Sequence, residues 1–88
     1  MADERKLLFL TQHAQDAIGE RDIQLAWIER TVWAPEWTEP DPRRPGVERR
    51  FRTIPGFGGR ALRVACYESG DAIRILTVFF DRDARRPE

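Results

Sequence analysis

The sequence has few of the residues that would stabilise a fold covalently or through a metal ion. Its single cysteine, Cys66, excludes a disulfide framework within the chain and a zinc site built on several thiolates. No run of about 18 apolar residues is present, so no membrane-spanning helix is expected. The apolar run near the start (7–10) is shorter than the core of a signal peptide. We therefore expect a cytoplasmic protein without a cofactor, a metal ion or a membrane partner.

Lysine is nearly absent, and fourteen of the fifteen basic residues are arginine. The formal net charge of zero conceals an uneven distribution along the chain. Up to Asp41 there are nine acidic residues against four basic ones, and from Pro42 onward eleven basic residues face six acidic ones. Such a split is typical of proteins that bind nucleic acid or a charged partner, although the two halves could instead pair with each other.

The periodicity predicts one α+β domain over residues 1–88. Thr11 is a suitable N-cap for a helix over 12–21, and a second helix over about 24–33 ends before Pro35. A proline-rich loop over 35–46 follows, with a short edge strand around residues 37–39. Residues 7–10 are expected to form a short strand or an extended entry, and three further strands are expected over 47–54, 60–68 and 72–80. The fold class is therefore two N-terminal helices packed on a mainly antiparallel sheet of three to four strands.

Alternation along these strands places several arginines on one sheet face. Leu62, Val64 and Cys66 form the apolar face of the strand over 60–68, and Phe51 is expected to face the same core. The other face would then carry four arginines and a tyrosine, namely Arg50, Arg52, Arg63, Arg74 and Tyr67. The arginines could bind successive RNA phosphates and the tyrosine could stack on a base, so Arg50, Arg52 and Tyr67 are candidate substrate-binding residues. An ordinary solvated face that resists aggregation has the same composition.

Three aromatic residues are candidates for a partner interface. Trp27 is predicted to point away from the core on the helical wheel, and Trp37 lies in the proline-rich loop. Phe80 belongs to a last strand that is apolar on both faces, with Ile73, Ile75 and Phe79 expected on the inner one. Such a strand is usually central in its sheet or covered by a partner chain or a returning tail. A loop that folds back over these aromatic residues would explain them equally well.

Few residues suit catalysis. His13, the only histidine, lies one turn into the first helix and has a side chain suited to acid–base chemistry near neutral pH. A solvated or capping histidine is an equally good interpretation. The segment over 56–59 is rich in glycine but lacks the Lys-Ser/Thr ending of a phosphate-binding loop, so we interpret it as a turn.

The run Leu10-Thr11-Gln12-His13-Ala14-Gln15-Asp16-Ala17-Ile18-Gly19-Glu20-Arg21-Asp22-Ile23 resembles the H-A-x-x-R-M-x-x-R-G-I opening of a small bacterial family of unknown function, which is itself similar to the BrnT and RelE/ParE toxins. The runs over 60–64 and 75–79 resemble the closing strands of that family. The resemblance implies a RelE/BrnT-like fold and a metal-independent ribonuclease toxin that an antitoxin protein blocks. It implies His13 as the catalytic acid–base and Arg63 and Arg74 as catalytic residues that stabilise charge.

Two residues depart from this motif. The first arginine of the motif is Ala17 here, and the glycine before its isoleucine is Asp22, so the resemblance also implies weakened activity. The leading hypothesis is a toxin-like domain that binds or cleaves RNA. The alternative is a non-catalytic interaction module that binds an antitoxin or a second copy of the chain through Trp27, Trp37 and Phe80.

Overall fold

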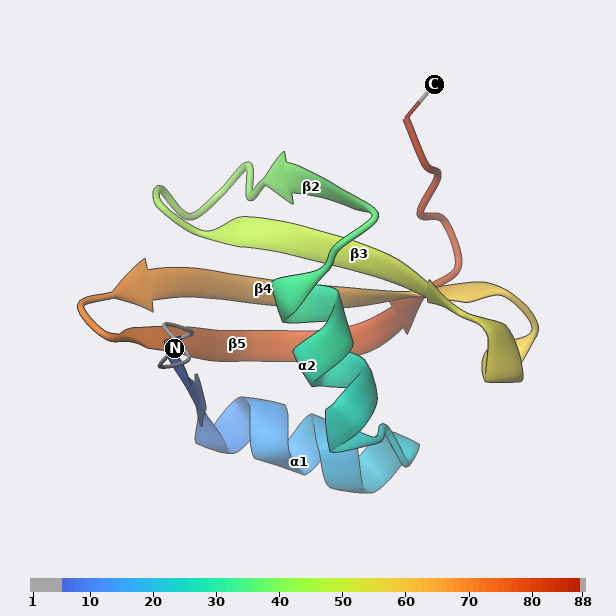
Figure 1. The fold of residues 1–88 in the computed structure, drawn as a ribbon, viewed down its shortest axis with the longest axis horizontal. Helices are drawn as coiled ribbons and strands as arrows, with labels where there is room; N and C mark the ends of the chain where they lie inside the picture. The colour runs from blue at the N-terminus through green and yellow to red at the C-terminus, as the bar shows by residue number, and fades with distance from the viewer. Residues whose placement is uncertain (1–5, 88) are drawn as a thin grey trace, which may run out of the picture.

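A computed structural model of the protein describes residues 6–87, with only the backbone of Phe57 described. The chain forms β1 (Leu7–Leu10), α1 (Gln12–Arg21), α2 (Leu25–Trp33), β2 (Trp37–Pro40), β3 (Glu48–Ile54), a short 3₁₀ turn (Pro55–Phe57), β4 (Arg60–Ser69) and β5 (Ala72–Asp81). The five strands make one sheet in the order β1-β5-β4-β3-β2 (Figure 1). The α+β class is thus confirmed, but the sheet is larger than predicted and mixed, because β1 runs parallel to β5.

Local signals explain where the helices begin and end. The Thr11 side chain accepts a hydrogen bond from the Ala14 amide at 3.2 Å, which caps α1, and its hydroxyl donates to the Ile75 carbonyl of β5 at 3.1 Å. Asp22 ends α1 in the left-handed conformation, with φ of 52°. These contacts fix the start of α1 against the strand beside β1.

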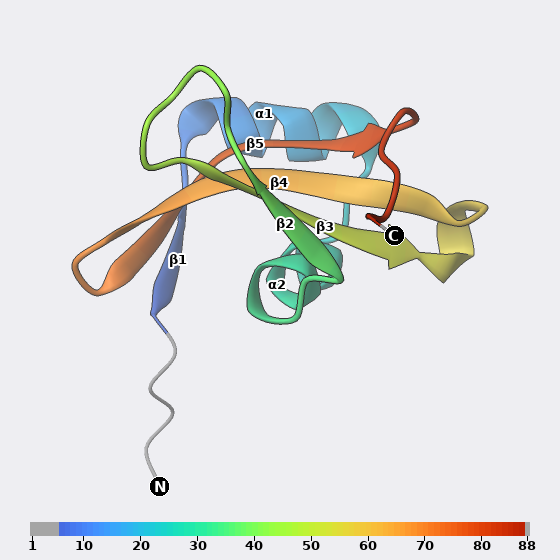
Figure 2. The same cartoon turned by 90° about the horizontal axis from the view of Figure 1, so that it is seen from above.

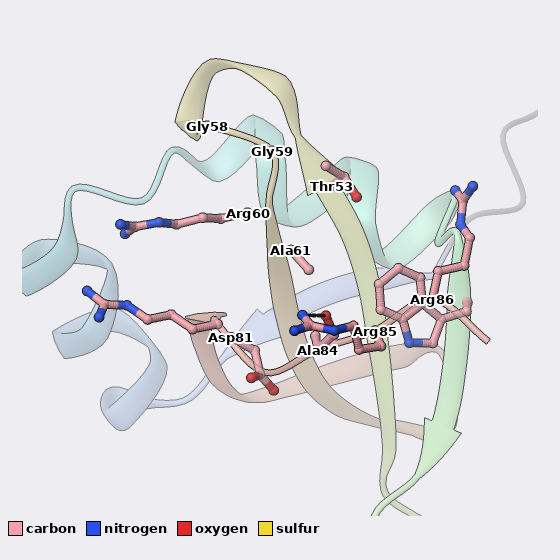
Figure 3. A pocket seen from close by; sticks show the side chains of 11 residues that line it. Thr53, Gly58, Gly59, Arg60, Ala61, Asp81, Ala84, Arg85 and Arg86 are labelled. Carbon is pink, nitrogen blue, oxygen red and sulfur yellow. Dashed lines mark hydrogen bonds between the residues drawn. The ribbon is translucent and has the colours of Figure 1, made fainter. Parts of the chain in front are cut away.

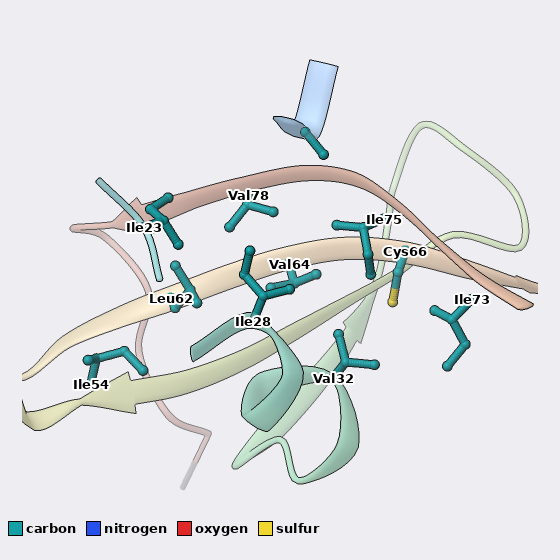
Figure 4. Close-up of a cluster of buried hydrophobic side chains, with 11 residues drawn as sticks. Ile23, Ile28, Val32, Ile54, Leu62, Val64, Cys66, Ile73, Ile75 and Val78 are labelled. Atoms are coloured by element: carbon teal, nitrogen blue, oxygen red, sulfur yellow. The ribbon is translucent and has the colours of Figure 1, made fainter. Parts of the chain in front are cut away.

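The buried residues of both helices and of one sheet face form a single apolar cluster (Figure 4). Ile28 and Val32 of α2 lie over β3 and β4, whereas α1 contributes Ala14 and packs along β5. The sheet residues in this cluster are Ile54, Leu62, Val64, Cys66, Ile73, Ile75 and Val78. We call this side of the sheet the helix-covered face and the opposite side the open face.

A bulge in β5 changes which of its residues point into the core. Ala65 pairs with Thr77 but Cys66 pairs with Ile75, so Leu76 is an extra residue without a partner on β4. Beyond this point Val78 and Phe80 lie on the helix-covered face and Phe79 lies on the open face. The prediction that Phe79 faces inward with Ile75 was therefore wrong.

The register of β3 also overturns the predicted arginine face. Arg50 pairs with Val64 and Arg52 pairs with Leu62, and residues directly opposite each other share a face. Both arginines consequently lie on the helix-covered face. Their Nη1 atoms donate to the carbonyls of Val32 at 2.8 Å and Ala34 at 2.6 Å, at the C-terminal end of α2. They complete the capping of this helix, so the prediction that they share a face with Arg63 and Arg74 was wrong.

The expected interface anchors are also used within the fold. Trp27 and Phe80 both pack against the apolar cluster, and their rings meet edge to face with centroids 6.1 Å apart. The helical wheel predicted that Trp27 points away from the core, and this prediction was wrong. The central position of β5 agrees with its apolar composition on both faces, because β1 and β4 flank it.

Candidate nucleic-acid interface

The open face holds the other two arginines of the predicted set. Arg63 lies in the middle of β4, between Phe51 of β3 and Phe79 of β5. Its guanidinium carbon is 4.7 Å from the centre of the Phe79 ring, and its Nη1 donates to Asp81 Oδ2 at 3.0 Å. The side chain is only 19% exposed, so both contacts hold the guanidinium in a fixed position.

Arg74 lies further along the same face, beside the tyrosine that the sequence analysis proposed. It pairs with Tyr67 of β4 and Phe9 of β1, and its guanidinium carbon is 5.0 Å from the centre of the Phe9 ring. Tyr67 is four residues from Arg63 on β4, which separates the two arginine positions by roughly 13 Å along the strand. Arg63 and Arg74 therefore share a face but do not form one site.

A cavity of about 400 Å³ opens beside Arg63. Four arginines and one carboxylate line it: Asp41, Arg43, Arg44, Arg49 and Arg63. We call it the β2–β3 cavity, because the loop between these strands supplies three of the five residues. With four positive charges against one negative charge, its lining favours an anion.

Asp41 organises this loop. Its carboxylate accepts hydrogen bonds from the amides of Arg43 and Arg44 at 2.9 and 3.0 Å, and from Arg44 Nη2 at 3.1 Å. Arg49 Nε of β3 donates to the same carboxylate at 3.4 Å. The backbone hydrogen bond from Arg43, followed by the bonds from Arg44, holds the Asp41 pKa far below its usual range. The loop therefore has one preferred conformation, and that conformation orients the arginines.

Arg43 differs from its neighbours in its partners. Among residues 6–87, no carboxylate lies within ion-pair distance of its guanidinium, whereas Arg44 and Arg49 pair with Asp41 and Arg63 pairs with Asp81. An incoming phosphate could therefore bind Arg43 without first breaking an ion pair. Arg63 Nε is also a buried donor without an acceptor in the described part of the chain.

Aromatic side chains adjoin the arginines on this face. Trp37 of β2 stacks on Phe51 of β3, with ring centroids 4.9 Å apart and planes inclined by 5°. Trp37 is thus occupied within the fold rather than projecting from a loop. Arginines interleaved with aromatic rings on an open sheet are typical of surfaces that bind single-stranded nucleic acid.

The three residues proposed as catalytic are not brought together. His13 is exposed in the first turn of α1, whose buried residue Ala14 belongs to the cluster on the helix-covered face. Arg63 and Arg74 lie on the opposite face of the sheet. Cys66 is buried, as predicted, and burial raises the pKa of its thiol to about 11.

Sequence reasoning missed Arg43, Arg44 and Arg49, which line the β2–β3 cavity. The sequence does contain a signal for this loop, because Asp41-Pro42-Arg43-Arg44 is the kind of segment in which an aspartate side chain binds the backbone two residues on.

The large apolar side chains that are most exposed are Leu7 (76%), Phe9 (54%) and Leu25 (51%). None of the three was among the predicted interface residues.

Two negative findings apply to the described part of the chain. Within residues 6–87, no helix is long and apolar enough to cross a membrane. The same residues contain no group of three histidine, cysteine, aspartate or glutamate side chains placed to hold a metal ion.

Comparison with protein families gives one match. Residues 10–80 match the family described as a domain of unknown function, DUF4258. Because the match covers far more than half of the 88 residues, the chain belongs to this family. No curated protein and no solved structure matches the chain.

Proposed function

We propose that this member of the DUF4258 family is a toxin-like domain that binds single-stranded RNA on its open sheet face. The observation that carries the proposal is the β2–β3 cavity, where four arginines surround a single carboxylate. The residues that line this cavity are held in place by contacts within the fold. Asp41 fixes the loop, and Phe79 and Asp81 fix the side chain of Arg63. The planar fork of arginine matches two phosphate oxygens at once.

The resemblance to BrnT and RelE/ParE toxins is the reason to propose RNA rather than another polyanion. The exposed side chains of Phe9 and Arg74, beside the half-buried Tyr67, suit unpaired bases, whose ring faces are accessible only in single strands. The proposal covers binding. Cleavage needs a base for the 2′-hydroxyl and an acid for the leaving oxygen, and His13 lies away from the arginines. Its catalytic role remains a separate prediction.

Binding can be tested by fluorescence anisotropy with a labelled eight-nucleotide uridine RNA. We expect Arg43→Gln to weaken binding at least fivefold and to reduce the slope of log K against log salt by about 0.7, the value for one phosphate contact with a single strand. Arg21→Gln on α1 is the matched control, because it removes the same charge from the side of the helices. If both variants weaken binding equally, or the wild-type protein does not bind, the proposal fails.

The toxin-like role has its own test in cells. Induced expression should arrest growth, and Arg63→Gln should relieve the arrest if RNA binding on the open face causes it. His13→Ala distinguishes cleavage from binding: if His13 is catalytic, this variant retains RNA affinity while cellular RNA stays intact. Normal growth with intact RNA at high expression of the wild-type protein would contradict a toxin role.

A second candidate function is favoured by one observation on β1. This edge strand exposes Leu7 and Phe9, and an edge strand with apolar side chains can pair with a strand of another chain. The partner would be an antitoxin protein or a second copy of this chain. Phe9→Asp should abolish complex formation in size-exclusion chromatography with light scattering, and a complex that survives this change would rule out β1 as the interface.

A further inference from the structure

The segment that follows β5 returns across the open face. It leaves the end of β5 and turns back past β4 and β3 (Figures 1 and 2). Asp81 Oδ1 accepts a hydrogen bond from the Asp83 amide at 2.9 Å, which turns the chain. Further along, Arg86 forms an ion pair with Glu36, the residue just before β2. The segment over 82–86 is therefore held at both ends, and it lies beyond residue 80, where the family match ends.

A second cavity, of about 370 Å³, lies under this segment (Figure 3). Its walls come from β2, β3, β4, the end of β5, the turn at residues 58–59 and the segment itself. Four arginines are among the residues that line it: Arg60, Arg82, Arg85 and Arg86. Among the described residues, Asp81 is the only carboxylate in its walls, and it already pairs with Arg63 of the neighbouring cavity.

Three of these arginines have no acidic partner among the described residues. Arg86 pairs with Glu36, but within residues 6–87 no carboxylate is in ion-pair range of Arg60, Arg82 or Arg85. Arg85 donates only a long hydrogen bond, 3.4 Å, to the carbonyl of Ala84. Trp37 Nε1, in the wall of this cavity, is a buried donor for which the described residues supply no acceptor. The second cavity thus combines uncompensated positive charge with an unsatisfied donor.

The two cavities are neighbours on one face. Arg49 lines the β2–β3 cavity and Thr53 lines the second cavity, and both side chains point to the open face of β3 on either side of Phe51. Arg49 and Thr53 are four residues apart on β3, which corresponds to about 13 Å along the strand. A single phosphate group cannot occupy both cavities at this separation, whereas a polynucleotide can.

We propose that the second cavity is a second phosphate-binding site, so that the ligand is an RNA strand that spans both cavities rather than a mononucleotide. This inference rests on the proposed function of the β2–β3 cavity. Binding at one cavity makes binding at the other intramolecular, so a strand long enough to reach both gains affinity without new contacts at either site. Phe51 lies between Arg49 and Thr53 on β3, and Trp37, which stacks on Phe51, belongs to the wall of the second cavity.

The test uses the double variant Arg82→Gln with Arg85→Gln. Neither residue makes an ion pair among the described residues and both are exposed, so the fold should be retained. We expect at least a tenfold loss of affinity for the eight-nucleotide uridine RNA, and a salt slope smaller by about 1.4, which corresponds to two lost contacts. Affinity for uridine 3′-phosphate at the β2–β3 cavity should not change, because neither residue lines that cavity. Arg21→Gln with Arg30→Gln is the control of equal charge on the helices.

Other results separate the two proposals. If the double variant binds the RNA as tightly as the wild type while Arg43→Gln weakens binding, the second cavity is not a site and the proposed function stands. If the wild-type protein binds no RNA, both proposals fail. If an eight-residue polyglutamate peptide displaces the RNA at equal concentration, the face selects charge rather than nucleic acid, and the inference is overturned.

Discussion

Replacing Arg50 by methionine tests whether this residue stabilises the fold or binds a ligand. The register places its guanidinium on the helix-covered face, where the side chain is 15% exposed. It donates to the Val32 carbonyl and to Glu48 Oε1, each at 2.8 Å. A hydrogen bond that involves a charged group contributes about 1.5–3 kcal/mol, and Val32 belongs to the last turn of α2, where carbonyls lack partners within the helix.

Methionine retains most of the apolar stem and removes the charge, so we expect Arg50→Met to lower the free energy of unfolding by about 2 kcal/mol. For a domain of this size, that corresponds to a decrease in Tm of roughly 8–16 °C. Urea denaturation followed by circular dichroism gives the free energy directly. Arg74→Met is the control, because Arg74 is exposed and its contact with Phe9 should contribute about 0.5–1 kcal/mol.

The result that would refute this reasoning is an unchanged urea midpoint for Arg50→Met together with weaker RNA binding. Arg50 would then belong to the ligand-binding face, as alternation in the sequence suggested. Because β3 changes face with a slip of one residue, the same result would also reassign Arg52 and Phe51.

Three further predictions concern other parts of the molecule. The lowered pKa of Asp41 means that its contribution to stability is present above about pH 4 and is lost as the pH falls, so Asp41→Asn should lower the urea midpoint more at pH 6 than at pH 3; equal effects would contradict this. Cys66 should resist iodoacetamide at pH 8 until the protein unfolds, because it is buried and its thiol has a pKa of about 11; rapid alkylation of the folded protein would be inconsistent. Gly70→Ala should destabilise the β4–β5 hairpin by about 1–2 kcal/mol, because Gly70 has φ of 59°, whereas Gly19→Ala within α1 should be neutral or stabilising.

The elements themselves were predictable because local signals define them. Thr11 caps the first helix as expected, and Pro35 follows the end of the second. The expected strand over 7–10 and helix over 12–21 have the observed bounds, and the short edge strand near Trp37 is present as β2. Each of these features depends on a few neighbouring residues, which the sequence shows directly.

The sheet face on which each side chain lies was less predictable, because it depends on contacts between residues that are distant in the sequence. In β3 the pattern Arg50-Phe51-Arg52 favours an inward phenylalanine, yet Phe51 stacks on Trp37 and the arginines reach carbonyls of α2. In β5 one extra residue at Leu76 exchanges the roles of Phe79 and Phe80. The parallel pairing of β1 with β5 joins segments more than sixty residues apart, and no local pattern indicates it.

Internal pairing accounts for part of the uneven charge distribution along the sequence. Part of the acidic half does pair with the basic half, because Asp41 binds Arg44 and Arg49 while Glu36 binds Arg86. These pairs fix the loop and the segment that carry the remaining arginines. Internal pairing is therefore compatible with the proposed anion binding, since the pairs determine where the arginines without an ion pair among the described residues lie.

Three of the acidic residues without an ion pair among residues 6–87 lie on the helices, on the other side of the molecule. Asp16, Glu20 and Glu29 are exposed on α1 and α2, and among the described residues none has a basic partner within ion-pair distance. They would repel a polyanion from the helices, while Arg43, Arg82 and Arg85 attract it to the open face. A protein with zero net charge can in this way orient an approaching RNA strand. This attraction acts at long range and is screened by salt. Added salt should therefore slow the association of RNA with the wild-type protein more than its association with the Arg43→Gln variant.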